Sequence, residues 1–296
     1  MHAYLAEQPD LLAAIEADAD LKAMLSTPLI MSLFAFAYKD LTPEDAVHLR
    51  DLAASPGDLR DAIIKRYVRE RYAWEDRKHG PLAFSLDEID EVLGRAAMEN
   101  VIGGWWVEEN VLHSRILGLD VGCLSVFTTL AVQLNLLAPE RYNYWRFVHL
   151  LLRDYFAFGY ALPHLHDAHR SARRSAAKAL GQLGDARAVA PLIAALRDDV
   201  DAVVRLTVPI ALMRIGTPEA LVAIVRCGSW GDSIRAVHKL ECIGEPSVAG
   251  LIAVLRVAKE RLIRLAAAEA LEKIGTPEAL AAVNAFRRGE IKPDTE

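Results

Sequence analysis

Cysteine is scarce in this chain, and the few cysteines form no cluster. The 296 residues include three, Cys123, Cys227 and Cys242, and none belongs to a C-x-x-C pair. This spacing excludes a zinc knuckle and a disulfide framework, and it is typical of proteins in a reducing compartment. We therefore expect a cytoplasmic protein whose cysteines are small, buried apolar residues.

Targeting and membrane-spanning segments are also lacking. Acidic residues interrupt the first twenty positions, so the basic and apolar stretches of a signal peptide do not form. The longest weakly charged run covers residues 116–137, but it contains Asp120, Gln133 and Asn135, and no cluster of positive charge flanks it. A buried helix is therefore favoured over a membrane span, and no membrane partner is expected.

Neither half of the chain has a large excess of positive charge. The net charge is −6; residues 1–170 hold sixteen Lys and Arg against twenty-five Asp and Glu, and residues 171–296 hold eighteen against fifteen. Binding to the phosphate backbone of a nucleic acid requires a basic field. Nucleic acid is therefore not an expected partner.

An internal repeat is present in the second half. From residue 171 onward, four copies align on L-x-x-(L/I)-G, and their glycines, Gly184, Gly216, Gly244 and Gly275, are 32, 28 and 31 residues apart. In each copy an alanine- and leucine-rich helix ends at the glycine, and a short connector opens a second amphipathic helix. Two such helices cannot bury their apolar faces alone, so successive pairs should stack into an α-solenoid. The pattern resembles the short bacterial type of HEAT repeat.

The repeats offer candidate residues for contact with a protein partner or another ligand. The third copy is shorter than the others and carries Trp230, which marks either a kink in the superhelix or an exposed contact residue. Arg205, Arg235 and Arg264, on the first helices of copies two to four, are further candidates for this interaction.

Catalysis on the repeats is not indicated. Iron-dependent hydroxylases with HEAT-like repeats carry His-Glu dipeptides as metal ligands, whereas here His238 is followed by Lys239. A lyase-type enzyme with similar repeats remains an alternative, because the sequence does not exclude it.

The first half is expected to contain helices followed by a small hairpin. Helices are predicted at residues 10–25, 28–40, 58–74, 85–100 and about 123–137, with Ser85 and Glu88 forming a capping box. A tight turn at 141–144 and an aromatic helix at 147–162 complete the elements of a winged helix. Since residues 123–137 contain no Arg or Lys, this helix is expected to pack rather than to read DNA.

Two motifs in this half resemble landmarks of bacterial NACHT-type NTPases of the STAND class. LSTPLIMSLFAFAY places Pro28 where that family opens a helix with a proline that packs against adenine. YWRFVHLLLRDYFAFGYAL places His149 where the family ends its winged helix with a histidine that approaches the ADP phosphates in the resting state. The remainder of the second motif corresponds to Phe147, Asp154, Tyr155 and Ala157.

The resemblance implies a regulatory region without a nucleotide-binding core. The family's phosphate-binding loop, G-x-x-x-x-G-K-(S/T), does not occur in this sequence. The chain would be the C-terminal sensor region of a NACHT-type signalling NTPase and would not itself be an enzyme. It would hold no cofactor alone, and Pro28 and His149 would sense ATP or ADP only beside an NTPase core in cis or trans. A standalone HEAT-repeat scaffold is the alternative.

The expected fold class is therefore mostly all-α. We predict a helical domain at residues 1–80, a winged-helix-like domain at 81–165, a solenoid of about four HEAT-like repeats at 166–290 and a disordered tail at 291–296.

The histidines and Pro28 also have purely structural interpretations. His149 stands at a helix start, where it can hydrogen-bond to a neighbouring backbone carbonyl, and Pro28 suits the first position of any helix. His164, His166 and His169 resemble part of an H-x-H-x-D-H metal motif, but Asp167 comes one position early and the segment follows a helix. A solvated linker is favoured there, and no metal site is expected.

Overall fold

A computed structural model describes residue 22 and residues 25–38, 56–103, 111–113, 117–141 and 144–291. The chain forms two compact units, residues 1–157 and residues 158–296. Most of the helix expected at 10–25 and of the tail expected at 291–296 lies outside the described residues. The domain limits at residues 80 and 165 remain predictions.

The first unit contains the helices α3 (Pro28–Ala37), α5 (Pro56–His79) and α6 (Leu86–Gly103). Pro28 takes the first position of α3, as its fixed φ favours. α3 packs against α5, and apolar side chains from both helices are buried there. These are Ile30, Leu33 and Phe34 of α3 and Leu59, Ile63, Ile64 and Tyr67 of α5.

The start of α6 is the predicted capping box. The backbone N–H of Ser85 donates to Glu88 Oε2 at 2.8 Å, and the backbone N–H of Glu88 donates to Ser85 Oγ at 3.3 Å. The hydrogen bond from the Ser85 backbone holds the pKa of Glu88 below its usual value. Because two amides find acceptors in this way, the box fixes where α6 begins.

A small antiparallel sheet follows α6. Its strands are β1 (Val111–His113), β2 (Leu137–Arg141) and β3 (Tyr144–Phe147), and their order is β1-β3-β2. Leu112 lies opposite Trp145, and Ala138 lies opposite Arg146. The pairing of β2 with β3 confirms the predicted hairpin.

Helix α8 (Val121–Gln133) lies between β1 and β2 in the chain. Asp120 caps it by accepting the backbone N–H of Cys123 at 2.9 Å. The helix ends four residues earlier than predicted because Asn135 adopts a left-handed conformation with φ of 58°. No helix among the described residues is both long enough and apolar enough to cross a membrane.

Helix α9 (Leu150–His164) begins later than predicted. Phe147 belongs to β3 instead, where it pairs with Leu137 and is fully buried. Pairing to a neighbouring strand thus takes precedence over the helical spacing of the first apolar residues.

The prediction of buried cysteines is wrong. Cys123 and Cys242 are exposed, and Cys227 is half-buried. Cys123 lies in the first turn of α8 and Cys242 in the last turn of α14 (Trp230–Ile243), and both face away from the packed side of their helix. Position on the helix therefore determines their exposure more than their apolar character.

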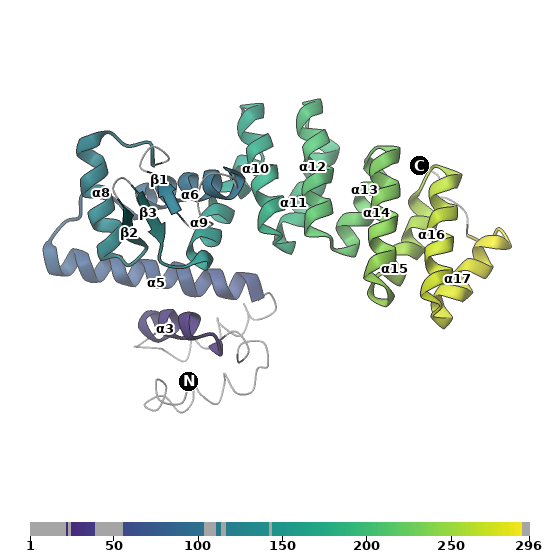
Figure 1. Cartoon of the computed structure of the whole chain (residues 1–296), viewed down its shortest axis with the longest axis horizontal. Coiled ribbons are helices and arrows are strands. Elements are labelled where there is room, and N and C mark those ends of the chain that lie inside the picture. The colour runs from purple at the N-terminus through teal and green to yellow at the C-terminus, as the bar shows by residue number, and fades with distance from the viewer. Residues whose placement is uncertain are drawn as a thin grey trace. The chain divides into compact units, whose positions relative to one another are not determined.

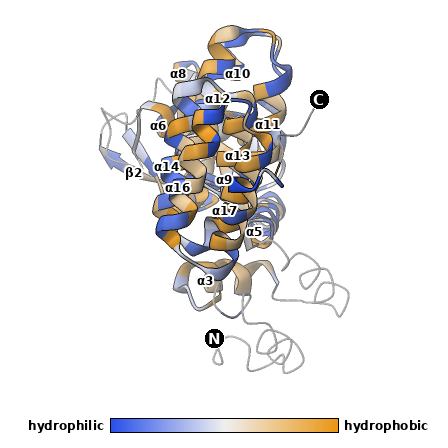
Figure 2. Ribbon diagram, turned by 90° about the vertical axis from the view of Figure 1, so that its right-hand side faces the viewer, coloured by the Kyte–Doolittle hydropathy of each residue, from blue (hydrophilic) through white to orange (hydrophobic). Residues whose placement is uncertain are grey.

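The second unit is the predicted α-solenoid, with four pairs of antiparallel helices after α9 (Figure 1). Figure 2 shows hydrophobic segments in orange and hydrophilic segments in blue along the helices. The pairs are α10 (Arg170–Leu183) with α11 (Val189–Asp198), α12 (Ala202–Ile215) with α13 (Pro218–Cys227), α14 with α15 (Val248–Val257), and α16 (Arg261–Ile274) with α17 (Pro277–Arg287). The mostly all-α fold class is confirmed.

The repeat glycines end the first helix of each pair, as predicted. Gly184, Gly216 and Gly275 are left-handed, with φ of 70°, 74° and 72°. Gly244 has φ of 79° and ψ of −140°, a region that only glycine occupies readily. The chain therefore turns at the same point in every copy.

The first helices α10 and α12 pack unusually closely. A Cβ atom at Gly181 of α10 would lie 2.5 Å from Ala211 Cα and 2.6 Å from Ala211 Cβ in α12. Ordinary contacts between carbon atoms are about 3.5–4.0 Å long. Glycine at position 181 thus allows the two backbones to approach each other.

The stacking of first helices changes between α12 and α14. α12 packs mainly against α10, α11 and α13, whereas α14 packs mainly against α13, α15 and α16 (Figure 1). The Lys239 ammonium of α14 still reaches the Met213 carbonyl near the end of α12. The linker between these copies is short: Gly228 and Ser229 join α13 to α14, whereas three residues join α11 to α12 and α15 to α16.

Candidate interaction surface of the solenoid

An arginine at the fourth position of the first helix recurs in three copies. Arg173 Nη1 donates to the carbonyl of Asp167 at 2.9 Å, and Arg205 Nη1 donates to that of Asp199 at 2.6 Å. In the fourth copy Arg264 Nη1 donates to the carbonyl of Ala258 at 2.6 Å. Each arginine thus ties its helix to the linker that precedes it.

The third copy has a serine at the same position. Ser233 Oγ donates to the Ser229 carbonyl at 2.9 Å, and the Ser233 side chain is buried. The linker there is too short to present carbonyls to an arginine, since only Gly228 and Ser229 separate α13 from α14.

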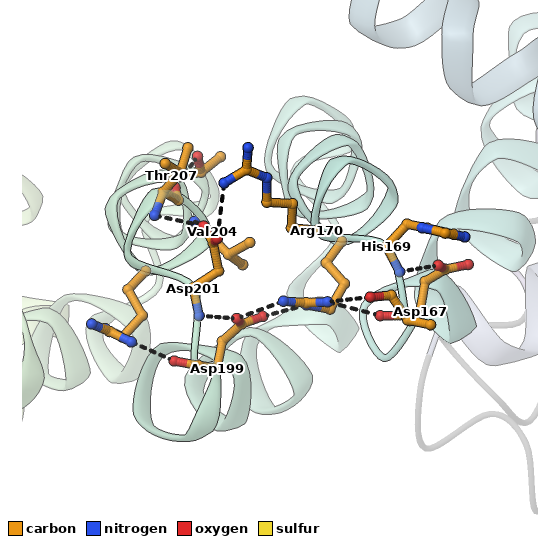
Figure 3. A network of polar contacts seen from close by, with 11 residues as sticks. Asp167, His169, Arg170, Asp199, Asp201, Val204 and Thr207 are labelled. Atoms are coloured by element: carbon orange, nitrogen blue, oxygen red, sulfur yellow. Dashed lines mark hydrogen bonds and ion pairs between the residues drawn. The ribbon is translucent and has the colours of Figure 1, made fainter.

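Asp199 joins the first two copies through the network shown in Figure 3. Arg173 Nε and Nη2 donate to the two Asp199 carboxylate oxygens at 2.7 and 3.0 Å, and the backbone N–H of Asp201 donates to Asp199 Oδ1 at 2.8 Å. The Asp199 side chain is almost fully buried. The hydrogen bonds from Arg173 hold the pKa of Asp199 below its usual value, because they stabilise the ionised carboxylate.

Asp201 connects the same network to the start of α12. Its carboxylate accepts the backbone N–H groups of Val203 at 2.8 Å and Val204 at 3.3 Å, which caps the helix. Arg170 Nη1 of α10 lies 3.5 Å from Asp201 Oδ2 (Figure 3). The N-terminal ends of α10 and α12 are therefore fixed against each other by ion pairs and capping bonds.

Two parallel rows of exposed side chains lie on this pair of helices. Positions one, five and nine of α10 are Arg170, Arg174 and Lys178, all exposed. The same positions of α12 are Ala202, Leu206 and Ile210, also exposed, with 66% of Leu206 and 53% of Ile210 accessible to solvent. We call the first set the basic row and the second set the apolar row.

The surroundings of the rows are positively charged. α10 and α12 together contain six basic residues and no acidic residue: Arg170, Arg173, Arg174, Lys178, Arg205 and Arg214. Asp199 and Asp201, which flank the start of α12, bind Arg173, Arg170 and backbone amides. The rows thus combine exposed apolar area with a local excess of positive charge.

The four predicted interaction residues do not form one site. Arg205 and Arg264 bind linker carbonyls, and Arg235 makes an ion pair with Asp232 within α14. Trp230 opens α14 and is 56% exposed. These contacts give the arginines a role in shaping the solenoid, while Trp230 has the exposure that a contact residue needs.

Pro28 and His149 both stand at helix starts in the first unit. His149 Nδ1 accepts the backbone N–H of Leu151 at 3.1 Å, so its partner is an amide rather than the carbonyl we expected. This bond requires Nδ1 to be unprotonated and leaves Nε2 as the ring nitrogen that can carry a proton. Of the other motif residues, Tyr155 is half-buried, and burial raises its pKa.

The three histidines near the solenoid start lie in different surroundings. The His164 ring stacks on Tyr160, and its Nδ1 lies 2.7 Å from the Tyr160 carbonyl. The His169 backbone N–H donates to Asp167 Oδ1 at 2.7 Å (Figure 3), and His166 is exposed. In the parts of the chain that the structure describes, no three His, Cys, Asp or Glu side chains are grouped to hold a metal ion.

Sequence reasoning missed the two rows. They become visible when the copies are aligned by position in the first helix, because positions one, five and nine form a single stripe. The L-x-x-(L/I)-G pattern that defines the copies lies at the end of each first helix and does not include these positions.

Comparison with known families agrees with this architecture. A model described as HEAT repeats matches residues 161–236, and a model described as PBS lyase HEAT-like repeat matches residues 263–286. No curated protein matches the chain. The second unit is therefore an α-solenoid, and its repeats are of the HEAT type.

Proposed function

We propose that this chain is a protein-interaction scaffold whose HEAT-type solenoid presents the outer side of its first helices to a protein partner. The observation that supports this most is the exposure of large apolar side chains on three successive first helices: Leu206 on α12, Trp230 on α14 and Leu262 on α16. Exposed apolar side chains gathered on one repeated element are a common mark of interaction sites. The linker-binding arginines and Asp199 hold these helices in fixed positions, which lowers the entropy lost on binding.

Site-specific photo-crosslinking in the source cells tests this function. A photoreactive amino acid replaces Leu206, Trp230 or Leu262 in the whole chain, and covalent adducts are identified by mass spectrometry. The scaffold proposal predicts defined adducts with another protein from at least one of these positions and none from Arg77, a polar position of α5. If no position on the solenoid gives a protein adduct, the proposal fails.

A finer proposal is that the scaffold is the regulatory part of a NACHT-type signalling NTPase. Its support is the order of the elements along the chain, which is α6, β1, α8, the β2–β3 hairpin and then α9. In the sheet the strands are ordered β1-β3-β2. Both orders are expected of a winged helix. His149 lies between β3 and α9, and its Nε2 remains able to donate to a phosphate. Pro28 opens α3, as the same resemblance requires.

In this finer proposal an NTPase core in cis or trans binds ATP or ADP, and His149 stabilises the ADP state. Such a clamp shifts the switch only by its difference in affinity between the two states. The chain alone should give no heat of ADP binding in calorimetry, because the phosphates need a loop of backbone amides and a lysine. Measurable binding of ADP to the chain alone would contradict this division of roles.

The proposed effect of His149 on nucleotide binding can be separated from its effect on helix stability. His149→Asp keeps an oxygen acceptor for the Leu151 amide but places a negative charge beside the phosphates. In the assembled NTPase this variant should release fluorescent ADP faster than wild type, whereas His169→Ala, at an exposed position, should not. Equal release rates for His149→Asp and wild type would remove the nucleotide-sensing role.

A further inference from the structure

The basic row and the apolar row run side by side along two rigidly joined helices. Each row covers positions one, five and nine, which is two turns or about 12 Å of helix. Helices in contact lie about 8–10 Å apart, and the close approach at Gly181 keeps α10 and α12 at the short end of that range. One partner helix, about 10–12 Å wide, can therefore touch both rows at once.

The apolar row lies where the stacking of first helices weakens. α12 packs mainly against α10 and not against α14, so Leu206 and Ile210 keep much of their surface in contact with water. Val203, one helical turn from Leu206, is also exposed and widens the apolar strip. The strip has the spacing of three or four residues on which amphipathic helices dock.

Charge determines which amphipathic helix fits this surface. Arg174 and Lys178 are exposed beside the apolar row, and neither α10 nor α12 contains an acidic residue. A basic helix would place like charges against Arg174 and Lys178. A helix with acidic side chains on one edge of its apolar face would instead pair with the basic row.

We propose that the α10–α12 surface binds an acidic amphipathic helix of a partner protein. Apolar residues of that helix, spaced at three and four, cover Leu206, Ile210 and Val203. Its acidic residues at i and i+4 meet Arg174 and Lys178. This inference rests on the scaffold function, and it adds the location of the binding surface and the chemistry of the partner.

Selection from a library tests the chemistry of the partner. A displayed library of helical peptides of about 15 residues, roughly four turns, is selected for binding to the whole chain. Peptides that also bind the triple variant Arg174→Glu/Lys178→Glu/Leu206→Asp are removed. The expected enrichment is for peptides with acids at i and i+4 beside an apolar strip. Enrichment of neutral or basic peptides, or none above the triple variant, overturns the proposal.

Point variants then test the location. Binding of an enriched peptide, followed by fluorescence anisotropy, should weaken about tenfold or more in Leu206→Asp and in Arg174→Glu/Lys178→Glu, and should weaken with added salt. Leu280→Asp is the matched control, because Leu280 is also an exposed leucine, 42% accessible to solvent, but lies on α17, a second helix of its pair, and it should bind as wild type. Circular dichroism confirms that each exposed-site variant remains folded. Equal losses in Leu280→Asp and Leu206→Asp would refute the α10–α12 location.

Two other occupants give different results. If a second copy of the chain covers the surface, sedimentation shows a dimer that Leu206→Asp dissociates, and the proposal is wrong. It is also wrong if a DNA duplex displaces the acidic peptide at equal concentration. If photo-crosslinking from Trp230 or Leu262 gives adducts with another protein but the library yields no acidic peptide, the scaffold function stands. Only the α10–α12 surface is then rejected.

Discussion

Replacing Gly181 with alanine should destabilise the solenoid even though alanine favours helices. The added Cβ would lie 2.5 Å from Ala211 Cα, about 1 Å inside the usual contact distance, and the nearest obstacle is backbone that cannot rotate away. Overpacking of this kind costs about 1–3 kcal/mol, and removal of a glycine from a helix interior returns about 0.5–1 kcal/mol. The expected net loss is therefore up to about 2.5 kcal/mol.

Gly159→Ala in α9 is the matched control. Gly159 lies inside a helix of the same unit, and a Cβ there meets no atom within 4 Å. It should therefore stabilise the protein by about 0.5–1 kcal/mol. Urea unfolding followed by circular dichroism measures both variants against wild type. If Gly181→Ala stabilises the protein as much as Gly159→Ala does, the close approach of α10 and α12 is wrong.

Three further predictions concern caps, charge and the core. Thr217→Ala should lower the free energy of unfolding in urea by about 1 kcal/mol, because Thr217 Oγ1 accepts the Ala220 N–H at 3.2 Å and caps α13. Thr27→Ala should lower it less, because the Thr27 side chain makes no capping bond. The lowered pKa of Asp199 means that its carboxylate stabilises the fold fully above its ordinary pKa of 3.8 and progressively less as pH falls below that value. The difference in unfolding free energy between wild type and Asp199→Asn should therefore be constant near neutral pH and shrink on acidification; a difference that does not change with pH would contradict an ionised Asp199. Leu212→Ala should cost about 2–5 kcal/mol, since Leu212 is fully buried, and a loss below 1 kcal/mol would show that the repeat leucines are not the core.

The repeated part of the fold was predictable because local signals agreed with one another there. The leucine and glycine spacing fixed each helix end, and Gly184, Gly216 and Gly275 turn the chain as left-handed caps for the reason given from sequence. The capping box at Ser85 and the Pro28 helix start were predictable for the same reason, since both depend on residues within one turn.

Features that depend on neighbours distant in sequence were not predictable. Phe147 fits the helical pattern of the following residues, but pairing with Leu137 places it in a strand. Arg205 and Arg264 donate to linker carbonyls, a contact that the sequence analysis did not predict, and their role in partner binding stays a prediction. The basic and apolar rows depend on which helix packs against which, and this information is absent from any single repeat.

The interrupted stacking at α12 and α14 affects how the solenoid unfolds. In a repeat array, cooperativity comes from the free energy of the interfaces between neighbouring units. Where first helices no longer stack, the interface is carried mainly by α13 with α15 and by α13 with α14, so the coupling is weaker at this junction than within either half. Residues 170–227 and residues 230–287 can therefore open as separate blocks, and a partner bound to α10 and α12 would protect the first block while leaving the second free to fluctuate.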